Sequence, residues 1–401
     1  MIYIYMLLLL VLFIVWKRKN ILVKGLIVTY IISAVSAIAL MYLDPNCIFL
    51  YQTKYEPLFY LLIILIIVFD GFSNFEFNVI KINNNKNKIL KFADFIGWLY
   101  VPVVLLLLFN DVNVLTNVNL STYRVEGDYY ATGLFKGGLF LSLCIYISEL
   151  SFVPQFLFFY LIQFQDVSSN LKIRLFLASF SFAMMTLMFA GRDGIVFWIM
   201  NAVIFYFLFN NWYTPRIIKS IKIWGIFLVA MIAIPFLVIT AARFVMVGND
   251  SILSIITPLV DYIGQGPHVF CQAFYVDRAD IKGYDVNALT TRDIQSFQLY
   301  LGWTFGTFAK SIVWRYGYLG AIIVSLGFNI IVRMVIRMFK RKNDIWSIFI
   351  LIMLFQIPFW GVFYYRYAIN NMEIVYLFFT VICIYISFNY KSKGIQRLYK
   401  I

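Results

Sequence analysis

The amino-acid sequence predicts an all-α membrane protein that crosses the bilayer many times. Hydrophobic residues make up 63% of the 401 residues and charged residues only 13%, whereas soluble globular proteins are about half apolar and a quarter charged. Apolar runs recur along the whole chain, and many are long enough to cross a hydrocarbon core of about 30 Å. Basic residues cluster in every second loop between these runs, as expected for loops at the cytoplasmic face.

We expect about eleven transmembrane helices within a single integral membrane domain, residues 1–401. The fifth apolar run is too long for one straight span and contains Glu149 and Pro154, so we expect it to be tilted, kinked or broken. The expected spans are Ile2–Val15, Leu22–Leu43, Pro57–Phe75, Phe92–Phe109, Lys136–Ile162, Leu175–Ala190, Ile195–Phe209, Ile223–Ala241, Tyr318–Met338, Ile345–Phe363 and Glu373–Phe388.

The charge pattern predicts the orientation of these spans. The first span has no basic residue before it and Lys17, Arg18 and Lys19 after it, the reverse of a secretory signal peptide, so we expect a retained helix with its N-terminus outside. The alternation of basic loops continues to the C-terminal tail, which places that tail in the cytoplasm. The net charge of +14 then belongs mainly to short cytoplasmic loops, and we expect no nucleic-acid partner.

One external loop is much larger than the others and covers residues 242–317, where we expect short helices. It contains His268, the only histidine of the chain. Its aromatic end, before the ninth span, has the composition of an interfacial or re-entrant segment. Cys47 and Cys271 both fall in loops on the expected outer side, so the sequence leaves open whether they form a disulfide. The four cysteines show no metal-ligand spacing.

Arginines are depleted from the outer side less than lysines are. In the expected topology Arg192, Arg243, Arg315 and Arg366 lie at span ends near the outer water–lipid boundary. Each arginine alone is typical of a side chain that snorkels to the interface. Together they predict a site for a phosphorylated lipid headgroup such as a polyprenyl diphosphate, because guanidinium binds phosphate oxygens in a bidentate manner and stays charged when partly desolvated.

The stretch "AGRDG" is expected to form a tight turn between the sixth and seventh spans on the outer face. Its glycines allow both a tight turn and close approach of another group to Arg192. The alternative is a short hairpin closure in which Asp193 caps the following helix.

The residue types favour chemistry without a cofactor or metal. The sequence contains no nucleotide-binding glycine loop, metal-ligand cluster or serine nucleophile motif. A lipid diphosphate is itself an activated glycosyl donor, and arginines stabilise the departing diphosphate. A hydroxyl of a second sugar would attack the anomeric carbon while Asp193, Asp261 or His268 accepts its proton. The choice among these three stays open, and His268 is more typical of a loop or packing residue than of a catalyst.

At this point the sequence resembles a family, the bacterial oligosaccharide repeat-unit polymerases, also called Wzy-type or O-antigen polymerases. The resemblance lies in the multi-span layout with a large external loop and in the stretches "MFAGRDGIVFW", "TAARFVMVG" and "GWTFGTFAKSIVWRYGYLGAIIVSLGFNIIV". It implies a membrane-embedded, lipid-linked glycosyltransferase of the bacterial inner membrane, with its active site facing the periplasm. Such an enzyme joins undecaprenyl-diphosphate-linked repeat units into O-antigen or capsular polysaccharide.

The resemblance also implies residue roles and partners. Arg192 and Arg243 would bind the donor diphosphate, with Arg315 and Arg366 in support. We further assign sugar contacts to a mixed set of arginines and aromatic residues, although ordinary interface anchoring explains each aromatic alone: Arg124, Arg292, Trp303, Trp314 and Tyr316. The expected partners are the lipid-linked oligosaccharides, membrane lipids, a chain-length regulator and a flippase.

Two rival functions remain. One is an O-antigen ligase that transfers finished glycan to lipid A core. The other is a transporter of lipid-linked sugars or polysaccharide, which should carry charges deep in the bilayer. The interiors of the expected spans are nearly free of charged residues apart from Glu149, so the sequence favours the polymerase over a transporter. An acyltransferase is a weaker option, because such enzymes usually need a histidine near a span.

Overall fold

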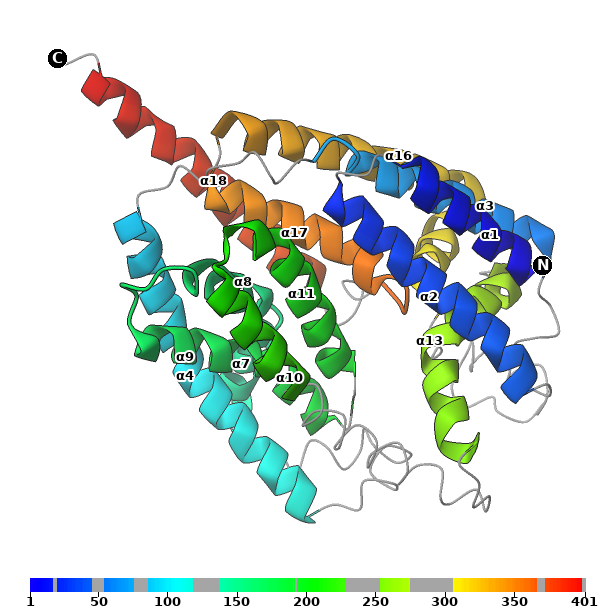
Figure 1. The fold of residues 1–401 in the computed structure, drawn as a ribbon, viewed down its shortest axis with the longest axis horizontal. Coiled ribbons are helices and arrows are strands. Elements are labelled where there is room, and N and C mark those ends of the chain that lie inside the picture. The colour runs from blue at the N-terminus through cyan, green and yellow to red at the C-terminus, as the bar shows by residue number, and fades with distance from the viewer. Residues whose placement is uncertain are drawn as a thin grey trace. The chain divides into compact units, whose positions relative to one another are not determined.

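The computed structural model describes residues 1–16, 20–44, 54–75, 86–117, 137–189, 191, 193–227, 253–274, 306–342, 344–365 and 372–398. Throughout these ranges the regular structure is helical, without a β-strand (Figure 1). Five of the helices are long and apolar enough to cross a membrane, or six if one bent pair counts as a single span. The chain is therefore a helical membrane protein, and the count of eleven spans and their orientation stay predictions.

The chain divides into two compact units. The first unit comprises residues 1–83 and 256–401. In it α1 packs on α2, α3 packs along α16, and α17 packs on both α16 and α18 (Figure 1). Its helices are α1 (Ile2–Val15), α2 (Ile21–Leu43), α3 (Tyr55–Gly71), α13 (Leu253–Phe274, which enters this unit at Ile256), α16 (Thr307–Lys342), α17 (Ile345–Trp360) and α18 (Met372–Leu398).

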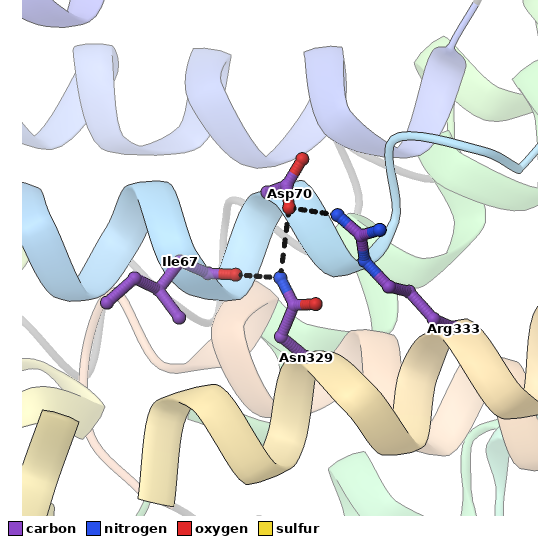
Figure 2. Close-up of polar contacts among 4 residues, drawn as sticks. All are labelled: Ile67, Asp70, Asn329 and Arg333. Carbon is purple, nitrogen blue, oxygen red and sulfur yellow. Dashed lines mark hydrogen bonds and ion pairs between the residues drawn. The ribbon is translucent and has the colours of Figure 1, made fainter. Parts of the chain in front are cut away.

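Helices α3 and α16 run in the same direction. Near the start of α3, the Tyr60 hydroxyl donates a hydrogen bond to the carbonyl of Tyr318, which lies in the first third of α16. Further along both helices, Asp70 accepts hydrogen bonds from Asn329, at 3.2 Å, and from Arg333 (Figure 2). This direction agrees with the topology that the sequence predicts, in which the third and ninth spans both enter the membrane from the outer side.

Helix α16 is broken at Gly317, where the backbone has φ 71° and ψ 179°. Residues with a Cβ are strained in this conformation, so glycine is required here. The break separates a first limb, residues 307–316, from a second limb, residues 318–342. The second limb covers the predicted ninth span, and the first limb is helical where the sequence predicted an interfacial or re-entrant segment.

The second unit comprises residues 84–255. In it α4 packs on α7, α9 and α10, while α8 packs on α9 and α11. Its described elements are α4 (Lys86–Asn117), α7 (Gly138–Ser148), α8 (Phe152–Leu161), α9 (Ser169–Ser179), α10 (Ser181–Met188), α11 (Asp193–Phe209), the 3₁₀ turn η2 (Asn210–Trp212) and helical residues 215–227. Most of the expected eighth span lies outside the described residues.

The expected break in the fifth span is confirmed. Helices α7 and α8 meet at an angle of 51°, and the buried Glu149 lies at the junction. The Tyr100 hydroxyl donates a 2.7 Å hydrogen bond to the Ile147 carbonyl beside the break. A side chain thus satisfies a backbone carbonyl at the break, as the low polarity of a membrane interior requires.

Two stretches that were expected to be loops are helical. Helix α4 continues to Asn117 past the predicted end at Phe109, and Asn110 and Asp111 are buried. The Asn110 side chain donates a 2.9 Å hydrogen bond to the Leu106 carbonyl of its own helix, so the polar residues do not end the helix. Within the predicted external loop, α13 is a helix of 22 residues, which exceeds the short helices expected there.

The "AGRDG" stretch joins α10 to α11 closely. An added Cβ on Gly194 would lie 2.8 Å from the Phe182 carbonyl oxygen of α10 and 2.9 Å from the Ala183 Cα. This close packing joins the two helices, and whether another group approaches Arg192 stays a prediction, because Arg192 lies outside the described residues. Asp193 is the first residue of α11, so it lies in the first turn, where a carboxylate is favourable, and not at the cap position.

Candidate functional site

A cavity of about 130 Å³ lies in the first unit. Its residues come from α3, from both limbs of α16, from α17 and the segment that follows it, and from the start of α18. The lining residues are Val68, Phe308, Ser311, Ile312, Arg315, Tyr316, Val324, Ser325, Phe328, Ile357, Tyr365 and Glu373.

Four polar lining residues lie close together, and we refer to them as the polar end of the cavity. Arg315, Tyr316, Tyr365 and Glu373 belong to the end of the first limb of α16, to the segment after α17 and to the start of α18. The remaining walls are mainly the aliphatic and aromatic side chains of Val68, Val324, Phe328 and Ile357. Such a lining fits a ligand with a charged head and a hydrocarbon chain.

The polar end contains an ion pair between Arg315 and Glu373. The Arg315 Nη1 atom donates to Glu373 Oε1 at 2.9 Å, and the two side chains are 52% and 44% exposed. Glu373 lies in the first turn of α18, where the helix dipole also favours a negative charge. The Arg315 guanidinium lies 5.8 Å from the centre of the Tyr316 ring.

Tyr365 adds a neutral phenol to the same end of the cavity. The pKa of Tyr365 is raised to about 12, chiefly by burial and to a lesser extent by the Glu373 carboxylate and Tyr316, while the Arg315 charge lowers it. The phenol therefore stays protonated at neutral pH and can donate a hydrogen bond to an oxygen of a ligand.

Four polar side chains form a stripe along α13, because their spacing of four, three and four residues places them on one helix face. They are Asp261, Gln265, His268 and Gln272, to which we refer as the α13 stripe. The helix approaches α2 closely, since an added Cβ on Gly264 would lie 2.6 Å from the Ala37 nitrogen. None of the four is among the residues that line the described cavity.

The geometry of His268 favours the packing role that the sequence left open. Its side chain is fully buried, and its Nε2 atom lies 3.0 Å from the Ala37 carbonyl oxygen. A carbonyl can only accept, so Nε2 carries the proton and donates. Burial lowers the pKa of His268 and the Ala37 hydrogen bond opposes this shift, so the imidazole is neutral at pH 7.

Asp261 is the one acid on the α13 stripe. Burial raises the pKa of Asp261 to about 6, and the neighbouring Asp44 at the end of α2 contributes to the increase. At pH 7 most of this carboxyl is still ionised, so its charge is held in an unfavourable environment.

The first limb of α16 also carries a buried amine, Lys310, and burial lowers the pKa of Lys310 to about 7. Its Nζ atom lies 5.0 Å from the centre of the Trp314 ring, and the Trp314 indole nitrogen donates a 3.0 Å hydrogen bond to the Ala273 carbonyl of α13. Trp314 therefore packs between the limb and α13, and it is not among the cavity-lining residues. Trp314 thus lies outside the lining of this cavity, and the sugar contact that we assigned to it stays a prediction.

The structure brings together Arg315 and Tyr316 among the expected site residues. Asp261, His268 and Trp314 belong to the same unit but line no part of this cavity, and Asp193 belongs to the second unit. Cys271 is a buried free thiol, and its possible partner Cys47 lies outside the described residues. The other expected site residues also lie outside them: Arg124, Arg192, Arg243, Arg292, Trp303 and Arg366.

Sequence reasoning missed Glu373, Tyr365 and Ser311. Glu373 marked only the start of the last span, and it lies 58 residues from Arg315 in the chain. Only the predicted topology could have linked the two residues. Arg315 lies just before the ninth span and Glu373 begins the eleventh, and both spans are expected to enter the membrane from the outer side.

Comparison of the chain with family models, curated proteins and solved structures gives no match. Within the described ranges, no three histidine, cysteine, aspartate or glutamate side chains gather as a metal site would require.

Proposed function

We propose that the protein is a membrane-embedded glycosyltransferase that polymerises undecaprenyl-diphosphate-linked oligosaccharide repeat units into O-antigen or capsular polysaccharide. In this proposal it acts at the periplasmic face of the bacterial inner membrane. The observation that supports it best is the cavity with Arg315 at its polar end and apolar side chains along its other walls. A polyprenyl diphosphate has the matching division between a charged head and a hydrocarbon chain.

In the proposed reaction, Arg315 binds the diphosphate of the donor lipid. As the bond between the anomeric carbon and the diphosphate oxygen breaks, that oxygen keeps the electron pair, and the guanidinium stabilises the growing negative charge. A hydroxyl of the acceptor sugar forms the new glycosidic bond, and its proton passes to the departing diphosphate, which leaves as the lipid diphosphate. The neutral Tyr365 phenol is placed to donate a hydrogen bond to a phosphate oxygen in the same cavity.

The test compares cells that carry Arg315→Lys, Arg315→Ala or the native chain after deletion of the native gene. The proposal predicts that both variants accumulate single lipid-linked repeat units and lose long polymer on a gel, because lysine cannot bind phosphate in a bidentate manner. Full-length polymer from folded Arg315→Ala protein would overturn the role of Arg315. Lipid-linked polymer without transfer to lipid A core after gene deletion would identify a ligase instead.

The same assay tests the sequence-based assignment of Arg192 and Arg243. Arg192→Ala and Arg243→Ala are each expected to shorten the polymer if they bind the donor diphosphate. Native chain length in both folded variants would remove them from the proposed site and leave Arg315 as the supported ligand.

Transport of the lipid-linked sugar is a second candidate function, and Glu149 favours it. This carboxyl is 1% exposed at the break between α7 and α8, and broken helices with buried ionisable groups are typical of transporters. Glu149→Gln should then stop movement of a lipid-linked sugar in proteoliposomes while the lipid remains bound. A polymerase whose Glu149 only stabilises the break would keep its activity in this variant.

A further inference from the structure

An arginine at the outer membrane boundary faces an abundant competitor for its substrate. Arg315 is 52% exposed, and the predicted topology places it at the level of the lipid headgroups. The headgroups of anionic phospholipids such as phosphatidylglycerol are the main anions at that level, and each carries one net negative charge, whereas the phosphatidylcholine headgroup is neutral overall. A site for a rare diphosphate lipid therefore needs a means of excluding them.

In the structure the Glu373 carboxylate accepts a hydrogen bond from the Arg315 guanidinium, the group to which a substrate phosphate would bind. The contact joins Nη1 to Oε1 at 2.9 Å, and both residues line the same cavity. Because the two groups belong to one chain, the carboxylate acts at a high effective concentration, which is in the millimolar range even for a flexibly linked partner. A weak, singly charged competitor is then at a disadvantage.

The ion pair is also weak enough to be exchanged. Pairs that are exposed to this extent contribute little to stability. A diphosphate carries more than one charge and offers several oxygens, so it can engage the guanidinium through two parallel hydrogen bonds. Once displaced, Glu373 remains in the first turn of α18, where the helix dipole stabilises its charge.

We propose that Glu373 holds the place of a substrate phosphate on Arg315, so that a diphosphate displaces it whereas the singly charged phosphate of a membrane phospholipid does not. This inference rests on the proposed function, because it assumes that Arg315 binds a diphosphate. Glu373 is thus a specificity-determining residue for the headgroup.

The test measures the binding of a fluorescent farnesyl diphosphate to the full chain in nanodiscs of phosphatidylcholine, with and without phosphatidylglycerol. Glu373→Gln keeps the shape of the side chain and removes its charge. In pure phosphatidylcholine this variant should bind the probe about two- to fivefold more tightly, the range expected on removing an exposed ion-pair competitor. Adding phosphatidylglycerol should weaken binding in the variant by a clearly larger factor than in the native chain.

Asp94→Asn is the matched control. Asp94, which is 52% exposed, forms an ion pair with Arg174, at 2.6 Å, in the second unit, so its neutralisation changes the net charge equally. This variant should respond to phosphatidylglycerol as the native chain does. If Asp94→Asn and Glu373→Gln behave alike, the effect arises from net charge and the proposal is overturned.

Arg315→Ala separates the two levels of the proposal. If Arg315→Ala removes probe binding but Glu373→Gln leaves affinity and lipid dependence at native values, Glu373 has no selective role and the diphosphate site stands. If Arg315→Ala binds the probe as the native chain does, the proposed function loses its site and the inference fails with it. Arg315→Lys, which keeps the charge, should bind with intermediate affinity and thus guards against misfolding of the alanine variant.

Discussion

Helix α16 carries two arginines that pair with carboxylates, and their surroundings differ. Arg333 meets Asp70 where α3 and α16 are packed together (Figure 2), and Asn329 bonds both to the Asp70 carboxylate and to the Ile67 carbonyl. Arg315 meets Glu373 at a cavity. We infer that the first pair serves helix packing and the second serves binding.

Backbone geometry supports this difference. An added Cβ on Gly71 would lie 3.2 Å from the Asn329 Cα and 3.3 Å from the Val332 Cβ, so α3 and α16 are in close contact at the Asp70 pair. By contrast, helix α16 is interrupted at Gly317, two residues after Arg315. The Arg315 pair lines the cavity there, which has room for a ligand. An ion pair that lines a cavity is therefore a candidate binding site, whereas an ion pair between closely packed helices is a structural contact.

The largest expected effect separates the two arginines by activity. Arg315→Lys should lower polymer formation by about 100-fold, the lower range for losing a group that stabilises a developing negative charge. Arg333→Lys should change it by about threefold or less, because the charge persists and neither Arg333 nor Asp70 lines the cavity. Quantitative polymer gels at matched protein levels measure both, and equal losses would show that the two pairs share one role.

The second effect concerns the break between the two pairs. Gly317→Ala should lower the stability of the protein by about 1–3 kcal/mol, the cost of a strained backbone conformation. Gly327→Ala is the matched control, because this glycine lies in the second limb with nothing within 4 Å of an added Cβ. Thermal unfolding in detergent measures both, and equal stability of the two variants would contradict the requirement for glycine at the break.

The third effect is the coupling between paired side chains. A double-mutant cycle on Asp70 and Asn329 should give about 0.6–1.7 kcal/mol, the range measured for hydrogen bonds between membrane helices. The same cycle on Arg315 and Glu373 should give a coupling near zero, as expected for an exposed ion pair. A larger coupling at the cavity than at the packed helices would reverse the assignment of structure and function to the two pairs.

The smallest effect concerns a carboxylate with an acidic neighbour. Because burial raises the pKa of Asp261 to about 6, the folded state holds the proton more tightly than the unfolded state. Its contribution to stability therefore falls as pH rises from about 4 to about 6. Asp261→Asn should unfold at a higher temperature than the native chain at pH 7.5 and at a similar temperature at pH 4.5; the same difference at both pH values would rule out this titration.

The sequence predicted those features that depend on local patterns. Apolar runs gave most helix positions. The excess length of the fifth apolar run, with Glu149 and Pro154 inside it, predicted an irregular span. A proline lacks the N–H that a continuous helix needs, and an ionisable side chain is unfavourable in the middle of an apolar span. The glycines of "AGRDG" predicted a short turn between two spans, and α10 and α11 do follow one another closely, with Gly194 packed against α10. These predictions required only neighbours in the chain.

The sequence did not predict features that depend on distant contacts. Asn110 looked like the start of a loop because its hydrogen bond to the Leu106 carbonyl and its burial cannot be read from residue type. Glu373 looked like a span boundary because its partner Arg315 becomes a neighbour only through folding. His268 looked like a loop residue because the polar stripe of α13 lowers the apolar character of that helix.

The most direct test of a diphosphate site at Arg315 is photo-crosslinking of the native chain with a photoreactive farnesyl diphosphate, followed by mapping of the labelled peptides. Labels should concentrate on cavity residues of α16 and α17, such as Phe328 and Ile357, compete with unlabelled diphosphate lipid, and disappear in Arg315→Ala. Labels that instead spread over the lipid-facing helix surfaces, with the same pattern in Arg315→Ala, would contradict a diphosphate site at Arg315.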